Sequence, residues 1–159
     1  MIRSFLRARA QPVERVVQLY VRGTRVIVAA THRSDAGLYY EQADPKVVEV
    51  REPAELGAAF RAAFDAFSLR DRDVTTVKKS DWPAYTASGL PSVKAFEREY
   101  TAIQCAGLNP SNAVVRASRV YPADPSMELS IAFNPLLAPG EIGALLLRLA
   151  RVGVPGSGV

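Results

Sequence analysis

The residues best suited to chemistry are the single histidine and the single cysteine of the chain. His32 stands three residues before Asp35, and a His-Asp pair can form a general base. Both residues belong to a predicted turn, however, and no nucleophile with a matching spacing accompanies them. We therefore expect His32 to be a surface residue. Cys105 lies in an apolar segment typical of a strand, so we expect a small buried hydrophobic residue there.

Two pairs of acidic residues are the remaining candidates for catalysis or metal binding. Asp71 and Asp73 alternate with arginines that would neutralise them on the surface, and Glu97 and Glu99 face different ways near a predicted helix end. One histidine and one cysteine cannot supply the four nitrogen or sulfur ligands of a structural zinc site. The chain also has neither a Gly-x-Gly-x-x-Gly nor a Gly-Lys-Ser/Thr motif. The sequence therefore predicts a protein that is not an enzyme and needs no metal or cofactor.

The length and composition predict one globular domain. The chain has 159 residues, of which 48% are hydrophobic and 23% are charged. We expect this domain to span 1–152 and to be followed by a flexible Gly-rich tail over 153–159. No apolar stretch approaches the roughly 20 residues of a membrane span. A single cysteine excludes an internal disulfide and fits a reducing compartment, so the expected location is the cytoplasm.

The formal net charge of +4 and the pI of about 9.5 raise the question of nucleic-acid binding. The arginines are scattered along the chain and acidic residues are interleaved with them. This distribution is typical of a solvated mixed-charge surface and does not favour direct nucleic-acid binding.

Apolar periodicity predicts an α+β fold with a mainly antiparallel sheet. In the first half, two β-branched runs around a Gly-containing turn predict a hairpin, further strands follow, and an apolar stripe predicts a helix over 54–67. The second half has the same order and ends in a predicted helix over 140–152. We expect both helices to pack on the sheet as equivalents.

A recurring motif suggests that the two halves are related. Pro-x-Glu-Leu-Gly-Ala-Ala-Phe at 53–60 returns as Pro-Gly-Glu-Ile-Gly-Ala-Leu-Leu at 139–146. We interpret this recurrence as an internal β-β-β-α duplication with pseudo-repeats over about 24–68 and 100–152. The alternative is a chance likeness between two units of the same order.

The segment between the halves, 69–90, is polar and has no counterpart in the first repeat. Asp81 could cap a short helix that ends at Gly89, and Ser92 could cap another. A segment outside the duplicated scaffold is free to vary with a partner, and aromatic residues are common in protein interfaces. The predicted contact residues are therefore Asp71, Asp73, Trp82 and Tyr85, with Tyr39 and Tyr40 as a second candidate pair, while packing within the fold is the alternative for each aromatic residue.

A resemblance to a known protein family suggests a function for the chain. Trp82, the segment Ser-Val-Lys-Ala-Phe at 92–96, Ile103 and the helix with Glu-Ile-Gly-Ala-Leu at 141–145 resemble bacterial immunity proteins of contact-dependent growth inhibition systems. The resemblance covers about 80–152. It implies a small, cytoplasmic, non-enzymatic protein that forms a one-to-one complex with the C-terminal toxin domain, often a nuclease, of a large secreted protein. The alternatives are a nucleic-acid-associated regulator and a small structural or secretion adaptor.

Overall fold

The fold is built around a long antiparallel hairpin, β1 (Arg15–Arg22) and β2 (Arg25–Arg33). The hairpin turns at Gly23, whose φ of 57° is a left-handed conformation that glycine adopts without steric cost. The computed structural model describes residues 13–71, 78–109, 111–117 and 129–153. The predicted hairpin is confirmed.

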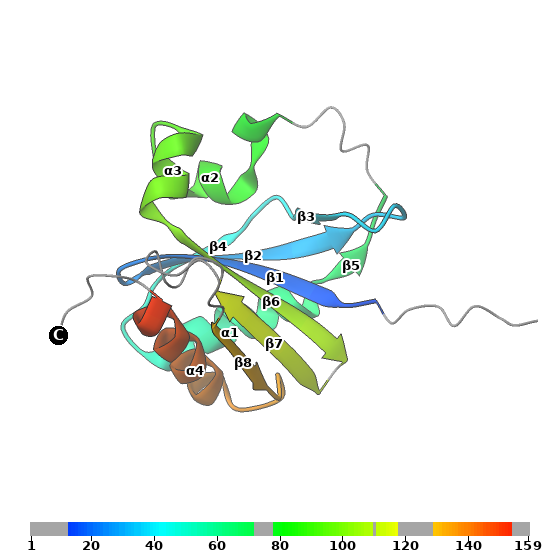
Figure 1. Cartoon of the computed structure of the whole chain (residues 1–159), viewed down its shortest axis with the longest axis vertical. Helices are drawn as coiled ribbons and strands as arrows, with labels where there is room; N and C mark the ends of the chain where they lie inside the picture. Colours follow the sequence, from blue (N-terminus) through cyan, green and yellow to red (C-terminus); the bar gives the residue numbers. More distant parts are fainter. Residues whose placement is uncertain (1–12, 72–77, 110, 118–128, 154–159) are drawn as a thin grey trace, which may run out of the picture.

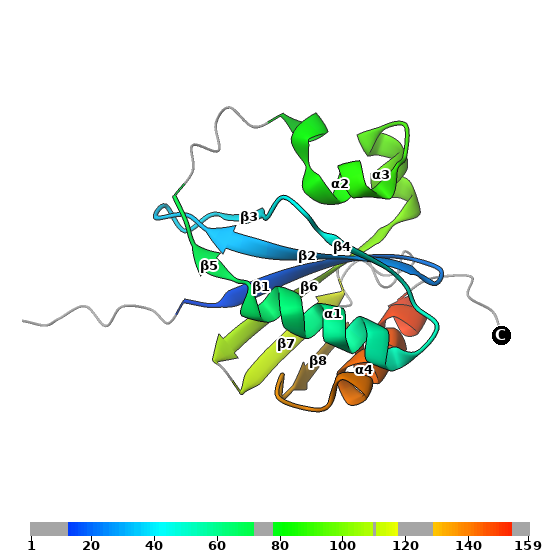
Figure 2. The same ribbon diagram turned by 180° about the vertical axis from the view of Figure 1, so that it is seen from behind.

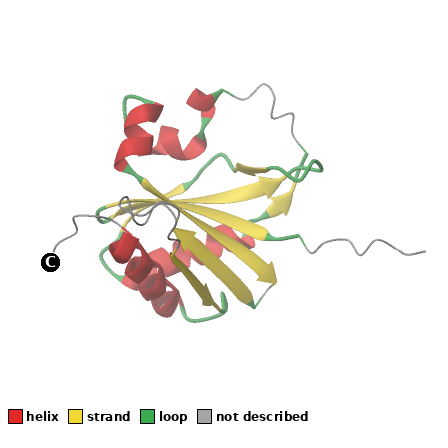
Figure 3. Cartoon of the chain, in the orientation of Figure 1, coloured by secondary structure: helices red, strands yellow, loops and turns green. Residues whose placement is uncertain are grey.

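One mixed sheet, almost wholly antiparallel, contains every strand of the described residues (Figure 3). Its main path is β3-β2-β1-β6-β7-β8, and β4 and β5 also pair with β2. The strands after the hairpin are β3 (Tyr39–Glu41), β4 (Lys46–Glu49), β5 (Ser68–Leu69), β6 (Thr101–Asn109), β7 (Asn112–Ala117) and β8 (Leu129–Phe133). The two-residue strand β5, which runs parallel to β2, was not expected from the sequence.

Helices cover both faces of the sheet. The long helices α1 (Pro53–Asp65) and α4 (Pro139–Gly153) lie side by side on one face, whereas the short helices α2 (Pro83–Ser88) and α3 (Val93–Glu99) lie on the other (Figures 1 and 2). The α+β fold and its mainly antiparallel sheet are thus as predicted.

Strand alternation divides the side chains between two hydrophobic clusters. Val17 and Leu19 of β1 face the long helices and join a large core with Phe60 of α1 and Leu146 of α4. Tyr20 follows Leu19 in β1, so its side chain points to the opposite face of the sheet, toward the short helices, and joins a smaller cluster. The larger core holds the sheet to α1 and α4, and the smaller one holds the short helices to the hairpin.

The strand order has an approximate twofold symmetry. Gln18 of β1 lies directly opposite Gln104 of β6, and the interval in sequence between these glutamines also separates Pro53 from Pro139, the first residues of α1 and α4. Around this centre, β4-β2-β1 mirrors β8-β7-β6. The topological unit therefore begins at β1, one strand earlier than the predicted repeat, which aligned β2 with β6. The duplication itself stays a prediction.

Residues 78–99, which include α2 and α3, form what we call the helical cap on the second face of the sheet. A short 3-10 helix, η1 (Lys79–Asp81), precedes α2. Asp81 does not cap α2 as predicted, because Pro83 fits the first helical position and makes Trp82 the N-cap residue. The left-handed Gly89 ends α2, and the hydroxyl of Ser92 accepts a hydrogen bond from the Ala95 N–H at 3.1 Å to cap α3. Both of these features agree with the sequence.

Some predictions fall on residues outside the described ranges. These are Asp73, the strand residues predicted over 118–121 and 127–128, and the tail residues 154–159. The limits of the predicted domain also stay a prediction. Within the described ranges, the helices are too short or too polar to cross a bilayer.

Candidate functional site

A tight turn places two adjacent tyrosines at the start of β3. The Ser34 N–H donates to the Leu38 carbonyl at 2.8 Å, and the Ser34 hydroxyl accepts from the Leu38 N–H at 3.1 Å. Gly37, with φ of 83°, supplies the left-handed position within this turn. As a result, Leu38 is 51% exposed at the tip, directly before Tyr39 and Tyr40.

Hydrogen bonds hold both tyrosines in place. The Tyr39 hydroxyl donates to the Glu14 carbonyl at 3.0 Å, and the Tyr40 hydroxyl donates to the Arg70 carbonyl at 2.6 Å. Burial raises the pKa of Tyr39, an effect that the nearby Arg33 opposes and Glu14 reinforces. The Tyr39 phenol is therefore neutral near pH 7, and hydrogen bonds hold both rings in a fixed orientation.

Glu41, the last residue of β3, links the sheet to the helical cap. Its carboxylate accepts hydrogen bonds from the Tyr20 hydroxyl at 2.5 Å, the Trp82 indole N–H at 2.8 Å and the Ala84 backbone N–H at 2.9 Å. Burial, together with this carboxylate, raises the pKa of Tyr20 far above its usual value. Tyr20 therefore stays a neutral donor to Glu41 across the physiological range of pH.

An aromatic cluster packs beneath the cap. The Trp82 ring meets Tyr20 edge-on at a centroid distance of 5.6 Å and Phe96 at 5.0 Å. Phe96 in turn contacts Tyr85 at 6.2 Å and Tyr100 at 5.0 Å. Edge-to-face contacts of this kind add to the free energy of burial. Trp82 and Tyr85 therefore help to hold the cap on the hairpin.

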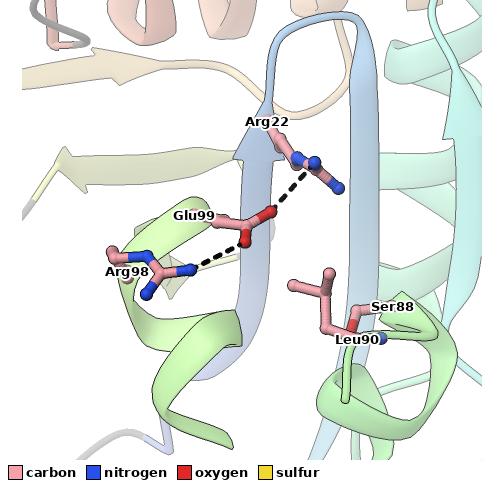
Figure 4. Close-up of polar contacts among 5 residues, drawn as sticks. All are labelled: Arg22, Ser88, Leu90, Arg98 and Glu99. Atoms are coloured by element: carbon pink, nitrogen blue, oxygen red, sulfur yellow. Dashed lines mark hydrogen bonds and ion pairs between the residues drawn. The ribbon is translucent and has the colours of Figure 1, made fainter. Parts of the chain in front are cut away.

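Ion pairs at the far end of the cap tie α3 to β1. Glu99 at the end of α3 pairs with Arg22 of β1 at 2.9 Å and with Arg98 at 3.1 Å (Figure 4). In the same view the Ser88 hydroxyl accepts a hydrogen bond from the Leu90 N–H at 3.1 Å, which shapes the link between α2 and α3. The cap is thus fixed at both ends, by Glu41 at one and by Glu99 at the other.

Between the cap and β2–β3 lies a cleft of about 470 Å³, which we call the aromatic cleft. Aromatic rings, an exposed leucine and a few charged side chains line this cleft. Its lining residues are Gln18, Tyr20, Thr31, Leu38, Tyr39, Tyr40, Glu41, Lys78, Lys79, Asp81, Trp82 and Pro83.

The structure brings together three of the six predicted contact residues. Tyr39, Tyr40 and Trp82, which come from two separate candidate groups, line the same aromatic cleft. Asp71 lies in an adjoining hollow of about 260 Å³ that shares Tyr40 and Glu41 with the cleft. Tyr85 packs in the aromatic cluster instead of lining the cleft.

Sequence reasoning missed four residues that line the cleft and are charged or exposed. They are the hydrogen-bonded carboxylate Glu41, the exposed Leu38, and the two lysines at 78 and 79. Glu41 follows two tyrosines in a predicted strand, and nothing local marks it as a tertiary link. Leu38 could have been found, because an apolar residue after an Asp-Ala-Gly turn is placed to be exposed at its tip.

His32 and Cys105, the residues first considered for catalysis, are both engaged in packing or hydrogen bonding. His32 Nδ1 lies 2.8 Å from the Ser68 hydroxyl, and the imidazole packs on Tyr40 with ring centroids 5.2 Å apart. Burial lowers the pKa of His32, and the positive charge of Arg70 lowers it further. Cys105 is fully buried in the large core, and burial raises the pKa of its thiol to about 12. A thiol with that pKa is not a nucleophile near pH 7.

Across the described residues, no three His, Cys, Asp or Glu side chains are grouped so that they could hold a metal ion. A second, wider groove of about 960 Å³ runs between β4 and α1 on the opposite face from the aromatic cleft, and alanines of α1 form much of its wall. In the aromatic cleft, by contrast, hydrogen bonds fix the aromatic rings and the Glu41 carboxylate in place.

Comparison with known proteins places this fold beside a toxin and immunity complex. No family model matches the chain, and no curated protein matches it. Solved structures that share the fold include a protein of unknown function from Neisseria meningitidis, with 17% identity and a TM-score of 0.66 over 87% of this chain and 94% of that one. They also include a chain of the CdiA-CT/CdiI toxin and immunity complex from Yersinia pseudotuberculosis, with 9% identity and a TM-score of 0.59 over 88% of this chain and 95% of that one. At these identities the likeness establishes a common fold.

Proposed function

We propose that this chain is an immunity protein that binds and neutralises the toxin domain of a contact-dependent growth inhibition system. The observation that carries the proposal is the fold shared with a chain of a toxin and immunity complex, because the match extends over nearly all of both chains. The sequence resemblance over about 80–152 supports the same family without relying on the fold.

The state of the candidate catalytic residues supports the inhibitory role within such a pair. Cys105 is buried with a protonated thiol, and His32 is engaged with Ser68 and Tyr40. Neither residue is placed to attack or deprotonate a substrate. On this proposal the chain acts by binding alone and is not an enzyme.

The binding surface that we propose is the aromatic cleft. Tyrosine and tryptophan supply large, rigid contact areas at a small cost in conformational entropy, and here hydrogen bonds already fix their orientation. Leu38 adds an exposed apolar side chain at the rim. Asp71 beside the cleft, and Asp73 two residues later in the sequence, would steer the encounter and contribute to specificity. Tyr85 would support Trp82 from behind.

The proposed complex contains one copy of this chain and one toxin domain, often a nuclease, in the cytoplasm of the producing cell. A growth assay tests the proposal. A candidate toxin domain, sought at the C-terminus of a large secreted protein encoded near this gene, is induced in cells that do or do not express the chain, and the chain should restore growth. Growth arrest despite good expression of the folded chain would contradict the proposal, and so would recovery of nucleic acid as the bound partner.

A further inference from the structure

We infer that the aromatic cleft binds a peptide segment in which an apolar side chain stands next to a carboxylate. The inference rests on the proposed function, since it assigns the chemistry of the toxin segment that would enter the cleft. Some groups of the cleft are already paired within this chain, and the groups that are not paired indicate what a partner must supply.

The aromatic walls offer carbon surface and few free polar atoms. The Tyr20 hydroxyl and the Trp82 indole N–H both donate to Glu41, and the Tyr39 and Tyr40 hydroxyls donate to backbone carbonyls. Leu38 extends this apolar wall at the rim, where half of its surface is exposed. An aromatic or aliphatic side chain of a partner would therefore gain the most from entering here.

The charged groups of the cleft are paired unequally. Glu41 accepts three hydrogen bonds, and Asp81 accepts from the Lys78 backbone N–H at 3.3 Å and from the Ser80 hydroxyl at 3.1 Å. The Lys79 ammonium has a single distant contact, to Glu97 at 3.9 Å, and its side chain is 83% exposed. The Lys78 ammonium makes no hydrogen bond or ion pair within the described parts of the chain.

Positive charge is therefore what the cleft has left to offer, and a carboxylate is the matching group. The half-buried Gln18 amide on the cleft floor likewise has no hydrogen-bond partner among the described residues, so it can bind the backbone of the same segment. The overall net charge of +4 would attract an acidic partner in the same sense.

A single strand of nucleic acid is the other ligand that combines flat apolar groups with negative charge. The carboxylates of Glu41 and Asp81 line the same cleft as the two lysines, so their formal charges cancel. A phosphate backbone needs a groove of net positive charge, whereas one or two carboxylates can bind the lysines individually. The arrangement thus favours an acidic peptide.

The test is a titration of the isotope-labelled full chain, followed by backbone amide chemical shifts. The probe is the blocked peptide Ac-Glu-Phe-Glu-NH2, with Ac-Gln-Phe-Gln-NH2 and Ac-Glu-Ala-Glu-NH2 as matched peptides and a short oligothymidylate as the nucleic-acid probe. We expect saturable shifts at 38–41 and 78–82, and binding of the first peptide about fivefold tighter than either matched peptide. Leu38→Asp, and Lys78→Gln combined with Lys79→Gln, should each weaken binding by about fivefold or more.

Two control variants carry the same chemistry elsewhere. Leu136→Asp replaces another exposed leucine (68% exposed), and Lys46→Gln removes a lysine of the second groove, so both should bind like the parent chain. Equal binding of the three peptides, shifts confined to another face, or tighter binding of the oligothymidylate in the cleft would overturn the inference. If the peptide binds here but the toxin domain is not neutralised, the proposed function fails alone. If the toxin domain is neutralised and Leu38→Asp has no effect on its binding, this inference fails alone.

Discussion

Gly57 of α1 lies against the backbone carbonyl of Pro139, so that a Cβ atom at Gly57 would overlap the carbonyl oxygen. Gly143 of α4 lies in the same way against the carbonyl of Pro53. The two helices thus begin against each other through matching residues of the recurring Pro-x-Glu-x-Gly motif. The motif is explained by this contact, because only glycine allows the two backbones to approach so closely.

Gly57→Ala and Gly143→Ala should each destabilise the fold. The added methyl group would collide with backbone, which cannot move aside like a flexible side chain, so we expect a loss of about 1–3 kcal/mol in the free energy of unfolding. Urea denaturation of the full chain measures this loss. Gly140→Ala is the matched control, because a Cβ there meets nothing within 4 Å. Equal stabilities of the three variants would contradict the close contact.

Glu41→Ala should loosen the helical cap. It leaves the buried hydroxyl of Tyr20 and the indole N–H of Trp82 without their acceptor, which costs about 1–3 kcal/mol for a buried unsatisfied group. Glu49→Ala removes an exposed pair with Arg25 at 3.4 Å and should cost less than about 1 kcal/mol. Denaturation followed by tryptophan fluorescence reports on both, because Trp82 is the single tryptophan of the chain. A Glu41 variant as stable as the Glu49 variant would show that this link is dispensable.

Stability should fall as the pH rises above about 9 because of Cys105. Burial raises the pKa of its thiol from 9.0 to about 12, so the unfolded chain loses the proton first and is favoured between these values. The contribution is fully present below pH 9.0 and is lost toward about pH 12. From about pH 8 to about pH 10 we expect a loss of about 1.4 kcal/mol that is absent from Cys105→Ala. The comparison uses urea denaturation at both pH values, and an equal pH dependence in the two proteins would contradict the buried thiol.

Removing the side chains of His32 and Cys105 should leave toxin neutralisation intact. His32→Ala removes an imidazole whose contacts are Ser68 and Tyr40, and Cys105→Ser changes a residue of the large core that does not line the aromatic cleft. The growth assay with the toxin domain measures protection, and thermal denaturation confirms that each variant is folded. Loss of protection in a folded variant would mean that the chain acts by chemistry as well as by binding.

Much of the fold could be predicted from the sequence, because its signal is local. The apolar runs of β1 and β2 reflect strands that are buried on both faces of the sheet. The alternation in β8 and the apolar stripes of α1 and α4 reflect elements with one buried face. The strand β5 could not be predicted, since Ser68 and Leu69 are both exposed and show no alternation. The order of the strands in the sheet was also out of reach, because β3 and β4 both pair with β2, which only the tertiary structure reveals.

The candidate site was predicted in part. Aromatic composition pointed to Tyr39, Tyr40 and Trp82, but not to their meeting in one cleft across β2 and the cap. The prediction gave Trp82 a place at an interface, with packing within the fold as the alternative. Because Trp82 packs against Tyr20 and Phe96 and donates to Glu41, its replacement by alanine would disturb folding and binding together. Leu38, which is exposed, is the better residue with which to test the surface.

The most direct test of the central claim is the affinity of this chain for the candidate toxin domain of the growth assay, measured by isothermal titration calorimetry. We predict a one-to-one complex that Leu38→Asp weakens about tenfold or more and that Leu136→Asp leaves unchanged, because Leu38 lines the aromatic cleft and Leu136, which is also exposed, does not. Absence of binding by the parent chain would contradict the immunity function. An equal effect of the two substitutions would contradict the cleft as its binding surface.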